Sequence, residues 1–194
     1  RFQVPYMVCK TLAEAEKASF YPMVIKPVDS QGQRGVYRVD NFAEASKHFG
    51  SAMGFSKSGQ IILEKYISGR EVSVNAYVKD GEVIFSMLSD RESFPDLPGG
   101  IIKAHHLPSV FENTKTHTYI KELVAEAVKK LEINNGPVYF QIKVSDGHPY
   151  LIEVTPRLDG CHMWRLIKEY CGVNLLDMTM SHMLGKDIRT KKYD

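Results

Sequence analysis

The sequence is poor in cysteine, in excess charge and in long apolar runs, and each shortage excludes a class of protein. Three cysteines among 194 residues, none in a CxxC motif, are too few for the disulfide framework of a small secreted domain. Lysine plus arginine number 25 against 23 aspartate plus glutamate, which excludes a nucleic-acid binder that works through bulk positive charge. No apolar run approaches the roughly 18 residues of a membrane span. We therefore expect a cytoplasmic protein that binds neither nucleic acid nor membrane.

What the sequence does contain predicts an α+β protein of two lobes. Ten Tyr, nine Phe and one Trp exclude a disordered chain, and at about 150 residues per domain the length allows two closely joined lobes. Strands and one helix up to residue 66 predict a small lobe over 1–66. A larger lobe over 67–194 is expected to hold a mostly antiparallel sheet backed by helices, which differs from a doubly wound parallel sheet.

Hydrophobic periodicity and turn residues predict the individual elements. In the small lobe the expected strands are 21–28, 36–39 and 60–63, with a helix capped at 40–41 that runs to about residue 49 and a loop over 51–59. In the large lobe the expected strands are 72–78, 83–88, 101–107, 138–144 and 150–155, with a loop over 91–100. A long helix is expected from Asn113 or Thr114 to 134–136, and Asn174 caps a last one. Asp80-Gly81 and Asp146-Gly147 predict hairpin turns.

A lysine stands inside an apolar strand and is followed by a glycine-bearing loop. Lys26 lies in the run MVIKP, where a buried charge is costly and requires a partner. The alternative is a lysine whose stem packs while its amine reaches solvent. In the loop SQGQRG over 30–35, glycines allow backbone N–H groups to approach an anion closely, although the same string also suits a plain surface turn.

Two further segments carry polar groups in patterns that suit a nucleotide and a metal. In ILEKYISGRE a strand ends near Glu64 and another begins near Glu71, so the connector can offer backbone groups to an adenine and a carboxylate to ribose hydroxyls. In YLIEVTPR, Glu153, Thr155 and Arg157 recur at period two and share one face of an extended strand. Their oxygens suit Mg²⁺, and the arginine can bind a phosphate. The structural alternative is an ion pair within this strand.

Whether Gln141, on the facing strand, can share a metal with Glu153 depends on the register of the hairpin. The Asp-Gly pair at 146–147 favours a two-residue loop, which sets Glu153 opposite Phe140. Gln141 then faces the other side of the sheet, because a one-residue slip reverses every side chain. A shared metal therefore requires a three-residue loop that includes His148, or a β-bulge that restores the register.

The sequence resembles the ATP-grasp superfamily in four motifs, in their order and in the distances between them. The motifs are the strand lysine, the glycine loop, the acidic hinge and the Glu-x-x-Pro-Arg hairpin. The resemblance is closest to the ATP-grasp portion of carbamoyl phosphate synthetase large subunits and related carboxylate–amine ligases, and it covers roughly residues 20 to 185. It implies an ATP-grasp fold of two lobes with the nucleotide between them. It also implies a ligase that uses ATP and one or two Mg²⁺ ions, replaceable by Mn²⁺, to activate a carboxylate as an acyl phosphate for attack by an amine.

The resemblance implies a role for each matching residue. The candidate catalytic residues are Arg157, at the transferred phosphoryl group or acyl phosphate, and Lys26, at the α- or β-phosphate. The candidate nucleotide-binding residues are Lys26, Gln33, Arg34 and Gly35 at the phosphates, Glu64, Lys65, Tyr66 and Ile67 at the adenine, and Glu71 at the ribose. The candidate metal ligands are Gln141, Glu153 and Thr155. Lys103, His105 and His106 would come near the triphosphate; the alternative for the two histidines is that they are surface or hairpin residues.

Two departures from the family bear on activity. Thr155 stands where the family usually has asparagine, and a hydroxyl is a weaker metal ligand than an amide oxygen. Only 25 residues precede Lys26, and the first is Arg1, so we expect a piece of a longer enzyme that lacks the N-terminal domain of such ligases. That domain and small-molecule carboxylate and amine substrates are the expected partners, with a homodimer as an open alternative. The rival interpretations are a nucleotide-binding or regulatory module without turnover and a structural domain without a ligand.

Overall fold

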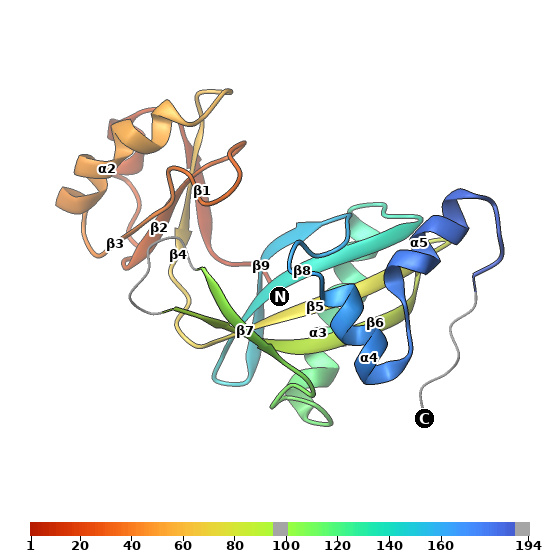
Figure 1. Ribbon diagram of the computed structural model, residues 1–194. Helices are drawn as coiled ribbons and strands as arrows, with labels where there is room; N and C mark the ends of the chain where they lie inside the picture. Colours follow the sequence, from red (N-terminus) through yellow and green to blue (C-terminus); the bar gives the residue numbers. More distant parts are fainter. Residues whose placement is uncertain (95–100, 189–194) are drawn as a thin grey trace. The chain divides into compact units, whose positions relative to one another are not determined.

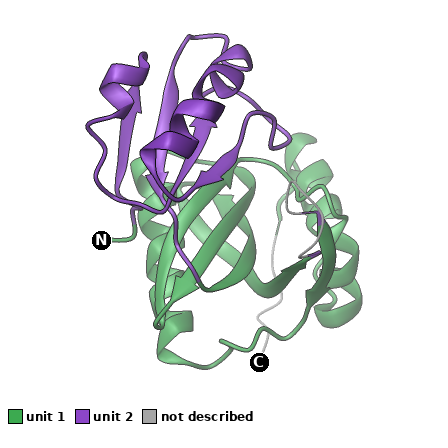
Figure 2. Cartoon of the chain, turned by 90° about the vertical axis from the view of Figure 1, so that its left-hand side faces the viewer, with its two compact units in different colours: residues 1–2, 69–93, 102–194 green, residues 3–68, 94–101 purple. Residues whose placement is uncertain are grey.

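The computed structural model describes residues 1–94 and 101–188 and divides into two compact units. Unit 2 comprises residues 3–68 and 94–101, and unit 1 comprises residues 1–2, 69–93 and 102–194 (Figure 2). Each unit contains an antiparallel sheet with helices packed on it, which confirms the α+β class. No helix within the described residues is long and apolar enough to cross a membrane.

Unit 2 is a four-stranded sheet with helices on one face. The strand order is β1 (Tyr6–Cys9), β4 (Ile61–Lys65), β2 (Met23–Pro27) and β3 (Tyr37–Val39), and all neighbours are antiparallel. The helices are α1 (Leu12–Ala15) and α2 (Phe42–Gly54). Alternate residues of β2 and β4, which include Met23, Ile25, Ile61 and Leu63, pack with Ala45 and Phe49 of α2 and are completely or almost completely buried. The other residues of these strands form the second face of the sheet.

The helix α2 begins where the sequence predicts and ends later. The Asn41 side chain accepts a hydrogen bond from the Glu44 amide at 3.0 Å, as expected for a cap. The predicted end near residue 49 and the predicted loop from residue 51 are wrong, because the helix continues to Gly54. Ala52 is completely buried in the core of unit 2, so packing overrides the weak helix propensity of the glycine and serine at 50–51.

Unit 1 is a five-stranded sheet covered by helices on both faces (Figure 1). Its order is β7 (Ile102–His106), β6 (Glu82–Ser93), β5 (Arg70–Lys79), β8 (Gly136–Ser145) and β9 (His148–Thr155), again antiparallel throughout. Val72, Val74, Ala76 and Val78 of β5 pack against α3 (Lys115–Lys130). On the opposite face, Tyr77 packs against α4 (Met163–Cys171) and α5 (Leu175–Met183).

Several predicted boundaries in unit 1 are wrong for identifiable reasons. The strand β6 continues to Ser93, where the sequence predicts a loop from residue 91, because its polar end pairs with β7. The rest of that predicted loop, 95–100, lies outside the described residues. The helix α3 ends at Lys130 and not at 134–136, and Gly136 already belongs to β8. The helix α4 was not predicted, although the buried residues Met163, Ile167 and Cys171 recur at a spacing of four.

Gly69 precedes β5 in a position that tolerates no side chain. Its φ is +133°, and a Cβ there would lie 2.0 Å from the Val144 carbonyl oxygen of β8. Gly59 also has a positive φ, +66°, but nothing lies within 4 Å of the place where its Cβ would be. An alanine at Gly59 would therefore have backbone strain alone, whereas an alanine at Gly69 would have both strain and a clash.

We expect Gly69→Ala to lower the free energy of unfolding by roughly 3 kcal/mol or more, since strain and backbone displacement add. Gly59→Ala should cost only about 1–2 kcal/mol, the price of a left-handed residue alone. Urea denaturation of both variants measures the difference, and equal losses would show that the close approach to Val144 has no energetic consequence.

Candidate functional site

The candidate phosphate lysine lies on the face of the unit 2 sheet that points away from the helix-covered core. Lys26 forms an ion pair with Glu64, and their side chains are 23% and 18% exposed. Glu64 pairs across the sheet with Val24, two residues from Lys26 on β2, so both charged side chains leave the sheet on the same face. The expectation that Lys26 requires a partner is confirmed. The partner is a residue for which the resemblance implies a role at the adenine.

The glycine loop and the hinge of unit 2 have defined conformations. Gln33 has a φ of +59°, and Arg34 Nε donates a hydrogen bond to the Gln31 carbonyl oxygen at 3.1 Å. Gly35 is buried with a φ of +76°, and a Cβ there would lie 2.9 Å from the side chains of Phe55 and Pro27. The loop is thus held at its end by a close contact that only glycine permits.

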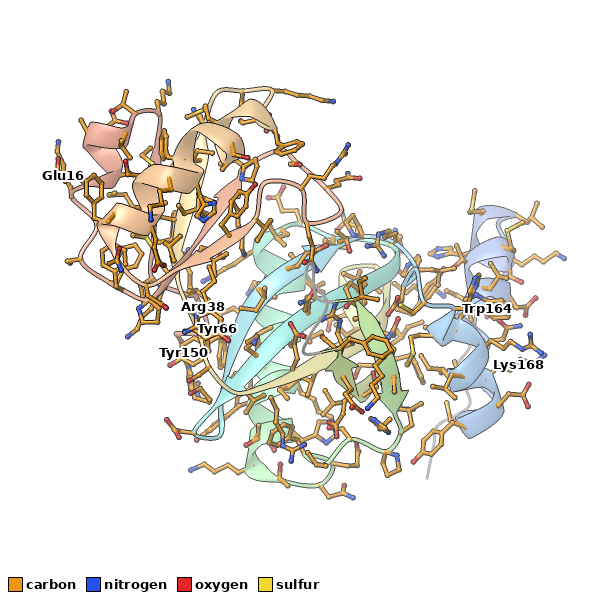
Figure 3. All side chains as sticks on the ribbon, turned by 60° about the vertical axis from the view of Figure 1, so that its left-hand side comes forward. Glu16, Arg38, Tyr66, Tyr150, Trp164 and Lys168 are labelled. Atoms are coloured by element: carbon orange, nitrogen blue, oxygen red, sulfur yellow. The ribbon has the colours of Figure 1, made fainter. Side chains whose placement is uncertain are left out.

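An arginine that the sequence did not single out covers the aromatic residue of the hinge. The Arg38 guanidinium lies 4.3 Å from the centroid of the Tyr66 ring (Figure 3). Arg38 is on β3 and Tyr66 directly follows β4, which places a cation–π contact beside the candidate adenine residues. The next hinge residue, Ile67, is buried, whereas Lys65 is exposed.

In unit 1 the hairpin contains the β-bulge that a shared metal site requires. Ser145 pairs with His148, so the loop has two residues, as Asp146-Gly147 predicts. This register persists to Ile142 and Leu151, where one residue of β9, Ile152, is skipped. Gln141 therefore pairs with Glu153, and the two side chains lie on the same face. Of the two ways to bring these residues together, the structure uses the bulge.

The carboxylate of Glu71 joins three strands on this face. Gln141 Nε2 donates to Glu71 Oε1 at 2.6 Å, and Arg91 Nη1 lies 2.5 Å from Glu71 Oε2. Ser93 Oγ donates to Glu71 Oε2 at 3.5 Å. The Arg91 side chain is only 9% exposed and that of Glu71 17%, so this is a largely buried ion pair. The candidate ribose residue and a candidate metal ligand are therefore in direct contact.

The three candidate metal ligands offer oxygen atoms of the kind that Mg²⁺ accepts. Among the described residues, no group of three or more His, Cys, Asp or Glu side chains could hold a metal ion. Glu153, Gln141 and Thr155 supply one carboxylate, one amide and one hydroxyl. Thr155 Oγ1 is buried and has no hydrogen-bond partner in the described part of the chain. Mg²⁺ characteristically uses one or two carboxylates and completes its shell with phosphate oxygens and water.

The segment after β9 returns over the polar face of the unit 1 sheet. The Arg157 guanidinium lies 5.5 Å from the centroid of the Tyr139 ring, and Tyr139 pairs with Thr155. Burial raises the pKa of the Tyr139 phenol, and the carboxylates of Asp159 and Glu153 raise it further. Asp159 Oδ2 is buried and, within the described residues, has no hydrogen-bond partner. Arg157 and Asp159 thus place charges of both signs beside the candidate metal ligands.

The sequence interpretation missed Arg91, Arg38 and Asp159 as neighbours of the candidate site. The hairpin register alone does not identify Arg91. The two-residue turn at Asp80-Gly81, continued regularly, sets position 90 opposite Glu71, and only the β-bulge between Tyr77 and Val78 shifts the pairing by one residue. The predicted loop from residue 91 also ends the strand too early. Arg38 and Asp159 had no signal in the sequence, because their contacts join segments far apart in the sequence or depend on an irregular turn.

His105 gives unit 1 a pH-dependent stability. Burial lowers the pKa of His105, as do Arg91 and His106, while Asp159 opposes the shift. A histidine whose pKa is lower in the folded state binds fewer protons there, so its contribution to stability is present above the unfolded pKa of about 6.5 and lost as the pH falls towards the folded pKa.

We therefore expect the free energy of unfolding to decline below about pH 6.5, and His105→Gln to reduce that decline. Urea denaturation at a series of pH values measures both slopes. The control is His162→Gln, since His162 is an exposed histidine of the same unit and is not among the groups that shift the pKa of His105. A decline that is unchanged in His105→Gln would contradict this assignment.

Comparisons with known proteins show the family of the chain. A family model described as the ATP-grasp domain matches residues 19–164, and the chain belongs to this family. It is 25% identical over 162 residues to dapdiamide A synthase of Enterobacter agglomerans, which covers 78% of this chain and 37% of that protein. It is 27% identical over 187 residues to the carbamoyl phosphate synthase large chain of Clostridium botulinum (strain Langeland), which covers 94% of this chain and 17% of that protein.

A solved structure shows the same fold. The L-amino acid ligase of Bacillus licheniformis matches with a TM-score of 0.72 and 28% identity over 94% of this chain and 43% of that one. The resemblance to the ATP-grasp superfamily and to carbamoyl phosphate synthetase is thus confirmed. The chain spans between 17% and 43% of the length of these relatives.

Proposed function

We propose that this chain is the ATP-binding part of a ligase that activates a carboxylate as an acyl phosphate for attack by an amine. The observation that carries the proposal is the bulge in the β8–β9 hairpin, which sets Gln141 opposite Glu153 on the strand that leads to Arg157. A regular two-residue hairpin would separate these side chains, and the irregularity suits a metal-binding role. The chain's family and its likeness to an L-amino acid ligase support the same reaction class.

The residues of each unit have distinct tasks in this proposal. In unit 2, Lys26 neutralises charge on the α- or β-phosphate, Gln33, Arg34 and Gly35 lie at the phosphates, and the hinge 64–67 binds the adenine. In unit 1, Glu71 accepts from a ribose hydroxyl, Gln141, Glu153 and Thr155 hold one or two Mg²⁺ ions, and Arg157 contacts the transferred phosphoryl group. Bound Mg²⁺ would neutralise phosphate charge and orient the γ-phosphoryl group.

The proposed reaction has two steps. An oxygen of the substrate carboxylate attacks the γ-phosphorus, the bond to the bridging oxygen breaks, and ADP leaves. An amine then attacks the acyl carbon, inorganic phosphate departs, and the amine loses a proton. The side chains named above take no covalent part, so their contribution is positioning and charge neutralisation.

The test is mass-spectrometric screening of the full-length protein with Mg-ATP and panels of carboxylates and amines. The proposal predicts ADP release that depends on a carboxylate, together with a coupled product. Turnover by residues 1–194 alone should be slight, because the relatives are far longer than this chain. Tight nucleotide binding without ADP release under any combination would instead support a second candidate function.

That second candidate is a nucleotide-binding module without turnover. Thr155 favours it, because a threonine hydroxyl is a weaker metal ligand than the asparagine amide usual at this place in the family. Thr155→Asn separates the two possibilities. In a working ligase this variant should leave ADP release similar or raise it modestly, whereas in an inactive module it should create a Mg²⁺-dependent activity that the wild-type protein lacks.

A further inference from the structure

Glu71 holds the amide of a candidate metal ligand in one orientation. A carboxylate only accepts hydrogen bonds, so the end of the Gln141 amide that lies 2.6 Å from Glu71 Oε1 must be its nitrogen. The amide is planar and its two ends point in different directions, so the carbonyl oxygen is turned away from Glu71. Only that oxygen can ligate a cation.

Glu71 is itself held in place from the opposite strand. Arg91 on β6 and Gln141 on β8 flank Glu71 on the central strand β5, and each occupies one oxygen of the carboxylate. The Arg91 side chain is 91% buried, so this ion pair is shielded from solvent and keeps its geometry better than an exposed one. Glu153 on β9 pairs with Gln141 on β8. The four residues therefore follow one another across the sheet in the order Arg91, Glu71, Gln141 and Glu153.

We propose that Glu71 is a positioning residue for the metal site: it keeps the Gln141 nitrogen engaged, so that the carbonyl oxygen is the end presented to a cation at Glu153. The inference rests on the proposed function and adds to it, because the resemblance implies only a ribose contact for Glu71. Without Glu71 the Gln141 amide can rotate so that its nitrogen and oxygen exchange places. The N–H groups, which repel a cation, then face the metal site. Such outer partners of metal ligands commonly change metal affinity tenfold or more.

The experiment must separate this role from a ribose contact. Tripolyphosphate carries phosphates but neither ribose nor adenine, so Mn²⁺ with tripolyphosphate probes the metal site of the full-length protein alone. Free Mn²⁺ is measured by electron paramagnetic resonance. We expect Glu71→Ala to weaken Mn²⁺ binding in the presence of tripolyphosphate roughly tenfold. Glu92→Gln is the matched control, since Glu92 is a paired carboxylate of β6 that contacts Lys103 and His106, and it should leave the affinity unchanged.

A double-mutant cycle tests whether Glu71 acts through Gln141. Gln141→Ala should weaken Mn²⁺ binding, and adding Glu71→Ala should then have no further effect. Additive losses would overturn the proposal, because they would mean that Glu71 acts independently of the amide. Unchanged Mn²⁺ binding in Glu71→Ala, with ATP binding alone weakened, would also overturn it and leave Glu71 a ribose residue only.

Two provisions keep the test decisive. Glu71→Ala leaves the buried Arg91 without its carboxylate, so the variant can fail to fold. Glu71→Ala/Arg91→Leu removes that unpaired charge and should show the same tenfold loss. If the wild-type protein binds neither Mn-ATP nor Mn-tripolyphosphate, the proposed function itself fails, whereas normal wild-type binding with an unaffected Glu71→Ala refutes only the positioning role.

Discussion

Glu153→Gln should lower ATP-dependent ADP release by the full-length protein about 100-fold or more. Glu153 is the only carboxylate among the three candidate metal ligands, and it lies opposite Gln141 because of the β-bulge. An amide in its place keeps the size of the side chain but removes the negative charge that favours Mg²⁺. A 100-fold loss corresponds to about 2.7 kcal/mol, within the several kcal/mol that a metal ion supplies to charge stabilisation.

The measurement is ADP release as a function of Mg²⁺ concentration, with the best substrate pair from the screen. The Mg²⁺ requirement of Glu153→Gln should rise together with the loss of rate. Glu82→Gln is the control, because Glu82 is an exposed glutamate at the other end of the same sheet, on β6. Wild-type rate and Mg²⁺ dependence in Glu153→Gln would remove this residue from the metal site.

Lys26→Ala should weaken ATP binding by roughly ten- to hundredfold. The lysine amine is partly exposed on the open face of the unit 2 sheet, where Glu64 neutralises it. Charge-assisted hydrogen bonds to phosphate oxygens are worth about 1.5–3 kcal/mol, which corresponds to that range of affinity. Calorimetric titration with Mg-ATP measures the change, and Lys47→Ala, on the exposed surface of α2, is the control.

The ion pair with Glu64 adds a second effect that the experiment has to separate. Lys26→Ala leaves Glu64 without its partner, so part of the loss can come from the unpaired carboxylate near the phosphates. Lys26→Ala/Glu64→Gln removes that carboxylate charge. If Lys26 contacts the nucleotide, the double variant stays weak; recovery of wild-type affinity would show that the lysine serves only to neutralise Glu64.

Local signals in the sequence predicted the elements whose formation depends on near neighbours. Asn41, Thr114 and Asn174 each accept a hydrogen bond from the amide three residues on, as cap residues should. Asp80-Gly81 and Asp146-Gly147 both form left-handed two-residue turns. These features depend on interactions within a few residues, so a single sequence is sufficient to find them.

The same reasoning failed where packing or pairing from elsewhere in the chain decides. Ala52 extends α2 because it is buried under the sheet, and β6 extends to Ser93 because β7 pairs with it. Both contacts lie beyond the few residues over which cap and turn signals act. The composition of these segments, with glycine and serine in one and charged residues in the other, is typical of loops, so tertiary contacts had to override it.

The candidate site shows the same division. The sequence by itself determined which residue types stand at the strand lysine, the hinge and the metal hairpin, and it determined that Gln141 could meet Glu153 only through a longer loop or a bulge. Only the tertiary structure showed that the β8–β9 hairpin contains a bulge, that Glu64 is the ionic partner of Lys26 and that Arg91 is the ionic partner of Glu71. The physical reason is that strand register and ion pairing depend on how both faces of a sheet pack at once, and most of the groups that pack there lie tens of residues apart.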